Sequence, residues 1–92
     1  MTLPELRNQI DAIDREGILL LKRRLEVARQ IASVKKRNRL PIFDAQRERM
    51  AKEEIRRLAQ ENQISILMAE EIFHLILTYT KQEMQRSAGE NE

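Results

Sequence analysis

Apolar residues recur along the first 37 residues of this 92-residue chain, at spacings that alternate between three and four. A repeat of this kind, held for more than four heptads, is the signature of a long helix that packs lengthwise against other helices. We call this set of positions the seam. It consists of Leu3, Leu6, Ile10, Ile13, Gly17, Leu20, Arg24, Val27, Ile31 and Val34.

Local signals place the two ends of this helix. Thr2 can cap its first turn, and Glu5, three residues on, completes a capping box around Pro4. Pro41 cannot continue a helix and favours an extended residue before it. The sequence therefore predicts a helix from Pro4 to Arg37.

Two shorter helices follow the proline. Asp44 is the predicted N-cap of a helix that runs to about Asn62, and Ser65 is the predicted N-cap of another that runs to about Arg86. No internal repeat or domain boundary is evident. We expect an all-α fold, a three-helix protomer that forms one domain over the whole chain, with a frayed tail at residues 87–92.

The predicted first helix is too long for a compact monomer. At 1.5 Å per residue it spans ~51 Å, whereas a compact chain of this size has a radius of gyration of ~12 Å and a diameter of roughly 30 Å. Two shorter helices cannot cover it, so its seam needs another subunit. An intertwined homodimer with two-fold symmetry is the simplest arrangement that supplies one.

The composition excludes several kinds of active site. Cysteine is absent and His74 is the only histidine, so a thiolate nucleophile, a catalytic triad and a cysteine or histidine metal site lack their residues. Two glycines are too few for a P-loop or a dinucleotide-binding turn. We therefore expect a site without a metal.

The charge pattern bears on partners and location. The net charge is only +2, the signs are interleaved, and aromatic residues make up 3% of the chain. These features argue against a nucleic-acid partner, which needs a continuous basic face or stacking platforms. The start of the chain lacks the pattern of a signal peptide, and no apolar run is long enough to span a bilayer. We expect a cytoplasmic protein without a membrane partner.

Two cations disturb the apolar face of the first helix. Arg24 occupies a seam position, and Lys35, 11 residues later, lies only ~20° from it in projection. A buried cation must be paired or hydrogen-bonded. A glutamate on another helix could satisfy Arg24 alone, but two cations directed into one core favour a buried anion site. Gly17, which costs about 1 kcal/mol of helix stability relative to alanine, would be explained by a close helix contact.

Arg7 is a third candidate for an anion site. It lies 17 residues before Arg24, which places the two side chains ~25 Å apart on one straight helix and on different faces. They cannot hold one small ligand within a monomer. In an antiparallel dimer, the start of one helix can lie beside the middle of its partner, so a site could take one arginine from each chain.

The start of the second predicted helix is dense in charge. Asp44 and Glu48 are one turn apart on a shared face, with Arg47 beside them. These carboxylates could accept hydrogen bonds from a ligand hydroxyl. A capping aspartate followed by an ordinary solvated first turn is the simpler interpretation of this segment taken alone.

Five segments, in this order and at these distances along three helices, resemble the all-helical class of chorismate mutases. They are LRNQIDAID at 6–14, KRR at 22–24, IASVK at 31–35, PIFDAQRER at 41–49 and IFHLI at 72–76. The resemblance implies a three-helix protomer interwoven into a dimer with two equivalent active sites. It also implies the pericyclic rearrangement of chorismate to prephenate, which requires no nucleophile, general base, metal or cofactor.

The family's ligand positions are matched in this chain residue by residue. Arg7 from the partner chain and Arg24 would bind the two carboxylates of chorismate. Lys35 would contact the ether oxygen, where negative charge builds as the carbon–oxygen bond breaks. Asp44, through its backbone, and Glu48 would bind the ring hydroxyl.

The resemblance also assigns three further positions. Arg47 would support the carboxylate side, and Thr80 stands where the family usually has a serine that contacts a carboxylate. Met84 is a departure, because its position matches the family's second ether-oxygen ligand, usually a glutamine or a glutamate. Methionine cannot donate a conventional hydrogen bond. The departure is compatible with a weaker enzyme, a rearranged site or a modified substrate such as an amino analogue of chorismate.

Two alternatives remain open at this point. The same fold could eliminate pyruvate from isochorismate, as related lyases do. From a different class, the chain could be a helical dimerisation or nucleic-acid-binding module, which would require a continuous basic face and salt-dependent binding to a duplex.

Overall fold

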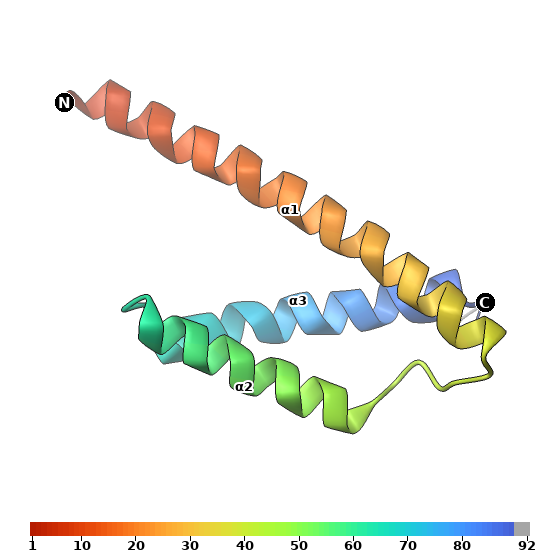
Figure 1. Cartoon of the computed structure of the whole chain (residues 1–92). Coiled ribbons are helices and arrows are strands. Elements are labelled where there is room, and N and C mark those ends of the chain that lie inside the picture. The colour runs from red at the N-terminus through yellow and green to blue at the C-terminus, as the bar shows by residue number, and fades with distance from the viewer. Residues whose placement is uncertain (90–92) are drawn as a thin grey trace.

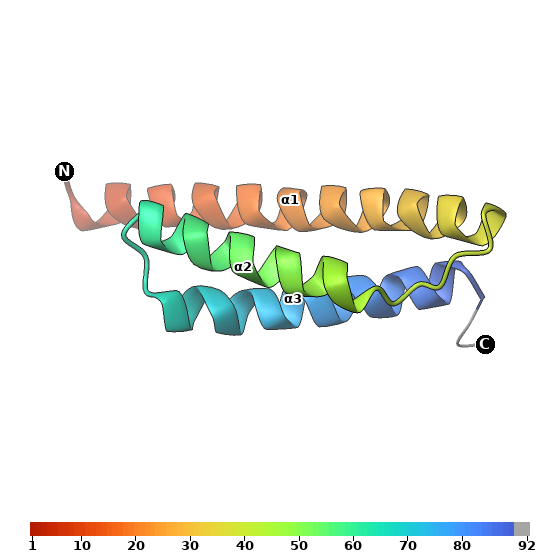
Figure 2. The same ribbon diagram turned by 60° about the horizontal axis from the view of Figure 1, so that its bottom comes forward.

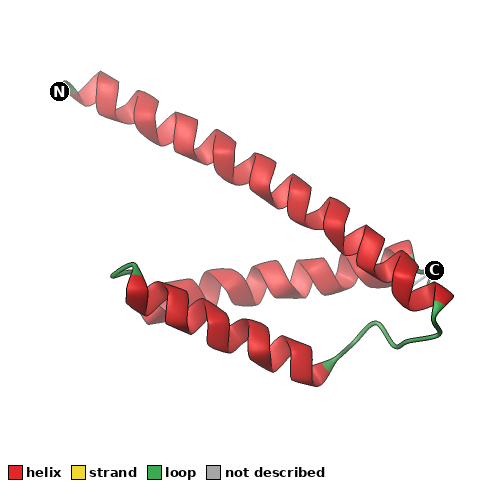
Figure 3. Ribbon diagram, in the orientation of Figure 1, coloured by secondary structure: helices red, strands yellow, loops and turns green. Residues whose placement is uncertain are grey.

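The computed structural model of the protein describes residues 1–89 as three α-helices (Figure 1). They are α1 (Leu3–Arg37), α2 (Ala45–Glu61) and α3 (Ile66–Ser87). Colouring by secondary structure shows helices joined by short loops, without a strand in the described part of the chain (Figure 3). The predicted all-α class is confirmed.

The predicted caps form at the start of all three helices. Thr2 and Glu5 make the reciprocal capping box, with both side chain–backbone distances at 3.3 Å. Asp44 and Ser65 each accept a hydrogen bond from the backbone N–H three residues on, at 3.0 and 3.2 Å. Each side chain satisfies a donor that the first turn of a helix leaves unpaired, which is why the starts could be read from sequence.

The helix bounds differ from the predicted ones by single residues. α1 begins at Leu3 rather than Pro4, and α3 ends at Ser87 rather than Arg86. The predicted frayed tail began at residue 87, but Ser87 is helical and the following Ala88 packs against the core. Residues 90–92 of that tail lie outside the described residues.

α1 ends in a turn that directs the linker back toward the helices. The backbone N–H of Leu40 bonds to the Lys35 carbonyl at 2.8 Å and that of Arg39 to the Lys36 carbonyl at 3.2 Å. Arg39 takes a left-handed conformation with φ of 56°. This pair of bonds is the Schellman arrangement that satisfies the last carbonyls of a helix. The linker after it then passes beside the ends of α1 and α3.

The three helices form an elongated molecule rather than a compact one. The radius of gyration is 16.3 Å and the long axis measures 55 Å, against ~12 Å expected for the radius of a compact chain of this length. α2 and α3 lie side by side and antiparallel, and α3 contacts α1 as well. The axes of all three helices lie roughly along one direction in Figure 2, where α1 runs the same way as α3 and opposite to α2. Toward its N-terminus α1 diverges from the other two (Figure 1).

The core is small and lies where α1, α3 and the linker meet. Its buried residues are Ala28 and Ala32 of α1, Ile42 of the linker and Met84 of α3. Two alanines one turn apart leave little side chain between α1 and α3, so the two helices can approach closely. α1 therefore packs on α3 through small residues beside the seam rather than through the seam itself.

The apolar seam residues are exposed along the whole of α1, with exposed fractions between 40% and 62%. They are Leu3, Leu6, Ile10, Ile13, Leu20, Val27, Ile31 and Val34. A β-carbon added at Gly17 would meet nothing within 4 Å. The described protomer therefore covers only in part the face that the sequence pattern marks for burial.

Candidate active site

A cavity of about 390 Å³ lies between the three helices and the linker. It brings together seven of the eight site residues predicted from sequence, which are Arg24, Lys35, Asp44, Arg47, Glu48, Thr80 and Met84. These residues come from three separate helices and from positions up to 60 residues apart in the chain. The folded chain therefore creates one common surface for them.

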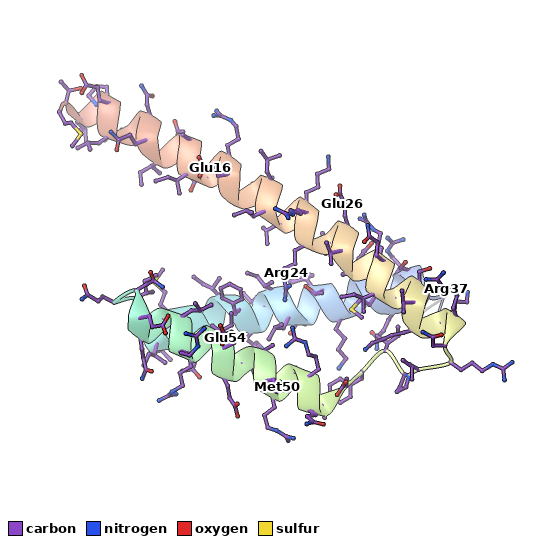
Figure 4. All side chains as sticks on the ribbon, in the orientation of Figure 1. Glu16, Arg24, Glu26, Arg37, Met50 and Glu54 are labelled. Carbon is purple, nitrogen blue, oxygen red and sulfur yellow. The ribbon has the colours of Figure 1, made fainter. Side chains whose placement is uncertain are left out.

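Arg24 extends from α1 into the space between α1 and α3 (Figure 4). Its Nε is fully buried and has no hydrogen-bond partner among residues 1–89. The interpretation in which a glutamate of another helix pairs with Arg24 is not realised within these residues. A buried N–H without an acceptor is costly, so an acceptor from outside the protomer would stabilise this arrangement.

Lys35 reaches the same cavity from the last turns of α1. Its ammonium group donates a hydrogen bond of 2.9 Å to the carbonyl of Ile42, and its side chain is half-buried. The lysine has three N–H donors, and this bond uses one of them. The bond to the linker thus helps to position Lys35 and leaves its other donors for a ligand.

α2 contributes a group of charged residues at its first turn. One oxygen of Asp44 accepts the backbone N–H of Arg47 at 3.0 Å, so the capping role inferred for this aspartate is confirmed. Glu48 is half-buried and lies 3.6 Å from Lys52 on the same helix. The guanidinium of Arg47 has no ion pair among residues 1–89 and is exposed at the edge of the cavity.

α3 forms a wall of the cavity that is poor in donors. The Thr80 hydroxyl donates to the Ile76 carbonyl at 2.6 Å, which leaves only acceptor capacity toward the cavity in this conformation. Leu77 and Met84 are apolar, and Met84 also belongs to the buried core. Lys81 also lines the cavity and was not predicted from sequence; its ammonium group lies 4.2 Å from the centroid of the Phe43 ring.

The signal that could have identified Lys81 is its spacing from two predicted residues. In projection it lies ~100° from Thr80 and ~60° from Met84, with Met84 between the two, so all three side chains fall on one side of α3. With Lys81, the cavity is lined by four cationic side chains and by two carboxylates, one of which caps α2. This surplus of positive charge suits an anionic ligand.

An ion-pair network holds α1 against α3 beside the cavity. Glu83 of α3 lies 2.8 Å from Arg29 of α1 and also pairs with Arg86 of its own helix. Hydrogen bonds from Arg86 and Arg29 lower the pKa of the Glu83 carboxyl from 4.5 to about 2. Glu83 directly precedes Met84, so this ion pair between α1 and α3 lies close to the site.

Arg7 is the one predicted site residue that does not line the cavity. It is exposed on the first turns of α1, 17 residues before Arg24. One protomer therefore keeps Arg7 and Arg24 apart, which is what the helix geometry predicted.

Two further features of the described residues concern metal binding and the membrane. No group of three histidine, cysteine, aspartate or glutamate side chains among them is arranged to hold a metal ion. None of the helices is at once long enough and apolar enough to cross a membrane.

The chain is similar to a known family over nearly its whole length. Residues 6–85 match the family described as chorismate mutase type II. A chorismate mutase of Methanocaldococcus jannaschii is 30% identical over 79 residues, which cover 86% of this chain and 80% of that protein.

Two longer proteins are similar over a part of their length. A bifunctional chorismate mutase/prephenate dehydratase of Aquifex aeolicus is 38% identical over 73 residues, which are 79% of this chain and 20% of that protein. A T-protein of Haemophilus influenzae is 44% identical over 59 residues, 64% of this chain and 15% of that protein. No solved structure matches the chain significantly.

Proposed function

The chain belongs to the chorismate mutase type II family, and we propose that two copies of it form composite sites that rearrange chorismate to prephenate. The observation that carries this proposal is the meeting of Arg24, with its buried and unpartnered Nε, and Lys35 in one cavity. Two cations from one helix face, with donors left free, suit a substrate that carries two carboxylates. The reaction is a step in aromatic amino-acid biosynthesis.

The reaction requires no nucleophile or general base from the protein. The bond between the ether oxygen and the ring breaks while a carbon–carbon bond forms, and no proton is transferred. The protein must hold a flexible dianion in its compact reactive conformer. It must also place a fixed cation near the oxygen that gains charge in the transition state.

Arg24 and Lys35 divide these two tasks. The planar guanidinium of Arg24 can bind a carboxylate through two parallel hydrogen bonds. Lys35 acts as a point charge at the ether oxygen, held there by the bond of 2.9 Å to the Ile42 carbonyl. Because this bond exists before the substrate arrives, little reorganisation is needed when charge develops.

The first turn of α2 would bind the ring hydroxyl. Glu48 is half-buried and lines the cavity, so its carboxylate can accept a hydrogen bond from that hydroxyl. Asp44 uses one side-chain oxygen for its cap, which leaves its backbone as the contact. Arg47 supports the carboxylate side. Thr80 could contact a carboxylate only if its hydroxyl left the Ile76 carbonyl, so its contribution is small.

Arg7 of the partner subunit would complete the site in an intertwined homodimer. Two more cavities adjoin the site and offer a path for a second α1. One of about 330 Å³ is lined by the seam residues Leu20 and Val27, and one of about 510 Å³ is lined by Phe73 and Leu77 of α3. Most of the exposed surface of both is apolar, which suits the exposed seam of another copy, although Lys52, Glu70 and Glu71 also line the larger one.

The experiment that tests this function follows chorismate consumption by the purified protein and identifies the product. Prephenate is expected, whereas salicylate with pyruvate would mean that the lyase alternative is correct. We expect Lys35→Ala to lower kcat/KM by roughly a thousandfold with the dimer still folded. A value near that of the wild type would contradict the role of Lys35.

The non-enzymatic alternative finds little support on α2. Arg57 pairs with Glu54 and Glu61, and Arg56 lies 3.7 Å from Glu70. These pairs interrupt a continuous basic face, so we expect no nucleic-acid partner. The location of the protein in the cytoplasm stays a prediction.

A further inference from the structure

The α3 wall of the cavity offers a ligand one free charged donor. Thr80 gives its proton to the Ile76 carbonyl, while Leu77 and Met84 have no donor. Lys81 is half-buried, lines the same cavity and has no acidic partner among residues 1–89. A ligand held between α1 and α3 can therefore receive a hydrogen bond from the α3 side only from Lys81.

Consecutive residues of the linker hold two lysines that come from different helices. The carbonyl of Ile42 accepts from Lys35 of α1 at 2.9 Å, and the ring of Phe43 lies 4.2 Å from the ammonium group of Lys81 of α3. Both side chains line the cavity. Two neighbouring linker residues thus contact one ammonium group from α1 and one from α3 at the same cavity.

Helix geometry places Lys81 close enough to Met84 to supply a hydrogen-bond donor in its place. The two residues are three positions apart, which is ~60° in projection and ~4.5 Å along the axis of α3. The flexible four-carbon stem of a lysine can cover that separation. An ammonium resting on an exposed aromatic ring is held weakly, so an anionic oxygen can draw it away.

We propose that Lys81 is a second catalytic cation, which contacts the ether oxygen of the substrate opposite Lys35 and supplies the donor that Met84 lacks. This inference rests on the proposed function, because it assumes that a carbon–oxygen bond breaks in this cavity. The contact strengthens as that oxygen gains charge, so it acts on the transition state more than on the bound substrate.

The test compares Lys81→Met, Met84→Gln and the double variant, with kcat and KM measured separately on chorismate. We expect Lys81→Met to lower kcat by about ten- to a hundredfold with KM within about threefold of the wild type. Met84→Gln should recover at least about tenfold in the Lys81→Met background and give a smaller gain in the wild type, because a glutamine donates from the same wall.

Two controls separate this role from a structural one. Lys36→Met removes a lysine charge from an exposed position outside the cavity and should leave kcat unchanged. Phe43→Leu removes the aromatic ring on which Lys81 rests and should lower kcat much less than Lys81→Met does.

Three results would overturn the role of Lys81. They are a kcat of Lys81→Met within about threefold of the wild type, an absence of recovery by Met84→Gln, and a loss in Phe43→Leu equal to that in Lys81→Met. If KM rises and kcat does not fall, Lys81 binds a carboxylate instead and the assignment to the ether oxygen is wrong. If the wild type forms no prephenate, the proposed function itself fails. A failure of the Lys81 role alone differs from this, because the wild type then still forms prephenate.

Discussion

The two parts of α1 share one apolar repeat but have opposite surroundings. From Arg24 onward the helix packs on α3, and Ala28 and Ala32 are 2% and 0% exposed. Before Arg24, every residue of α1 is exposed. The seam continues unchanged through both parts, so its periodicity indicates that a face is covered without telling which chain covers it.

The proposed site residues divide along the same line. The packed part of α1 supplies Arg24 and Lys35 to the cavity, where the linker and α3 fix their surroundings. The exposed part carries Arg7, which has no place in the site of its own protomer. The stable part of the helix thus prepares most of a site, and the other part would be the contribution of each chain to its partner.

The largest effect is expected from charges placed on the exposed part of the seam. Ile10→Asp with Ile13→Asp should abolish both the dimer and the activity, because burying an unpaired carboxylate costs several kcal/mol or more. Sedimentation velocity would detect a monomer. Asn8→Asp is the control, since it adds a charge ~140–160° away from both isoleucines on the same turns. A double variant that still sediments as an active dimer would show that the seam is not the interface.

A smaller effect is expected at Gly17, in the middle of the exposed part. A β-carbon there has free space in the protomer, so Gly17→Ala alone would add about 1 kcal/mol of helix stability. If a second α1 crosses closely at this point, Gly17→Leu should weaken dimerisation by about tenfold or more, since overpacking costs ~1–3 kcal/mol. Dilution series in analytical ultracentrifugation measure this constant. A dimer as tight as the wild type would place the crossing elsewhere.

The smallest effect is expected in the packed part of α1, where Glu83 of α3 pairs with Arg29 of α1 and with Arg86 of α3. Because the pKa of Glu83 is lowered from 4.5 to about 2 in the folded protein, its contribution to stability is present above pH 4.5 and is lost as the pH falls toward 2. Glu83→Gln removes that contribution at neutral pH. The melting temperatures of wild type and variant should therefore converge between pH 4.5 and 2.

Glu53→Gln is the matched control for this measurement. It changes an exposed glutamate of α2 that makes no ion pair among residues 1–89. Its melting curve should stay parallel to that of the wild type across the same range. A Glu83→Gln curve that also stays parallel would mean that the pair with Arg29 does not hold α1 against α3.

Local chemistry made the helices and part of the site predictable from sequence. Thr2, Asp44 and Ser65 satisfy backbone donors within their own first turns, so nothing distant decides where the helices start. The shared direction of Arg24 and Lys35 follows from helix geometry alone, and both line one cavity. The roles of these residues toward a substrate stay predictions.

The features that could not be predicted depend on contacts between elements. Ala28 and Ala32 do not stand out in a hydrophobic pattern, because alanine is common on any helix, yet they form the contact between α1 and α3. Lys81 looks like a solvated lysine until the linker brings Phe43 to it. Which surface would cover the seam likewise depends on a partner, and no periodicity in one chain reports whether a partner is present.

The central claim is that each site needs residues from two chains, and mixing two inactive variants tests it most directly. Arg7→Ala and Arg24→Ala homodimers should each lose about a hundredfold or more in kcat/KM, the loss expected for a charged bidentate contact. When the two variants are refolded together in equal amounts, half of the dimers are mixed. Each mixed dimer has one intact site out of two, so about a quarter of the wild-type activity should return. Mixed dimers verified by mass spectrometry that remain as inactive as the parents would contradict the account.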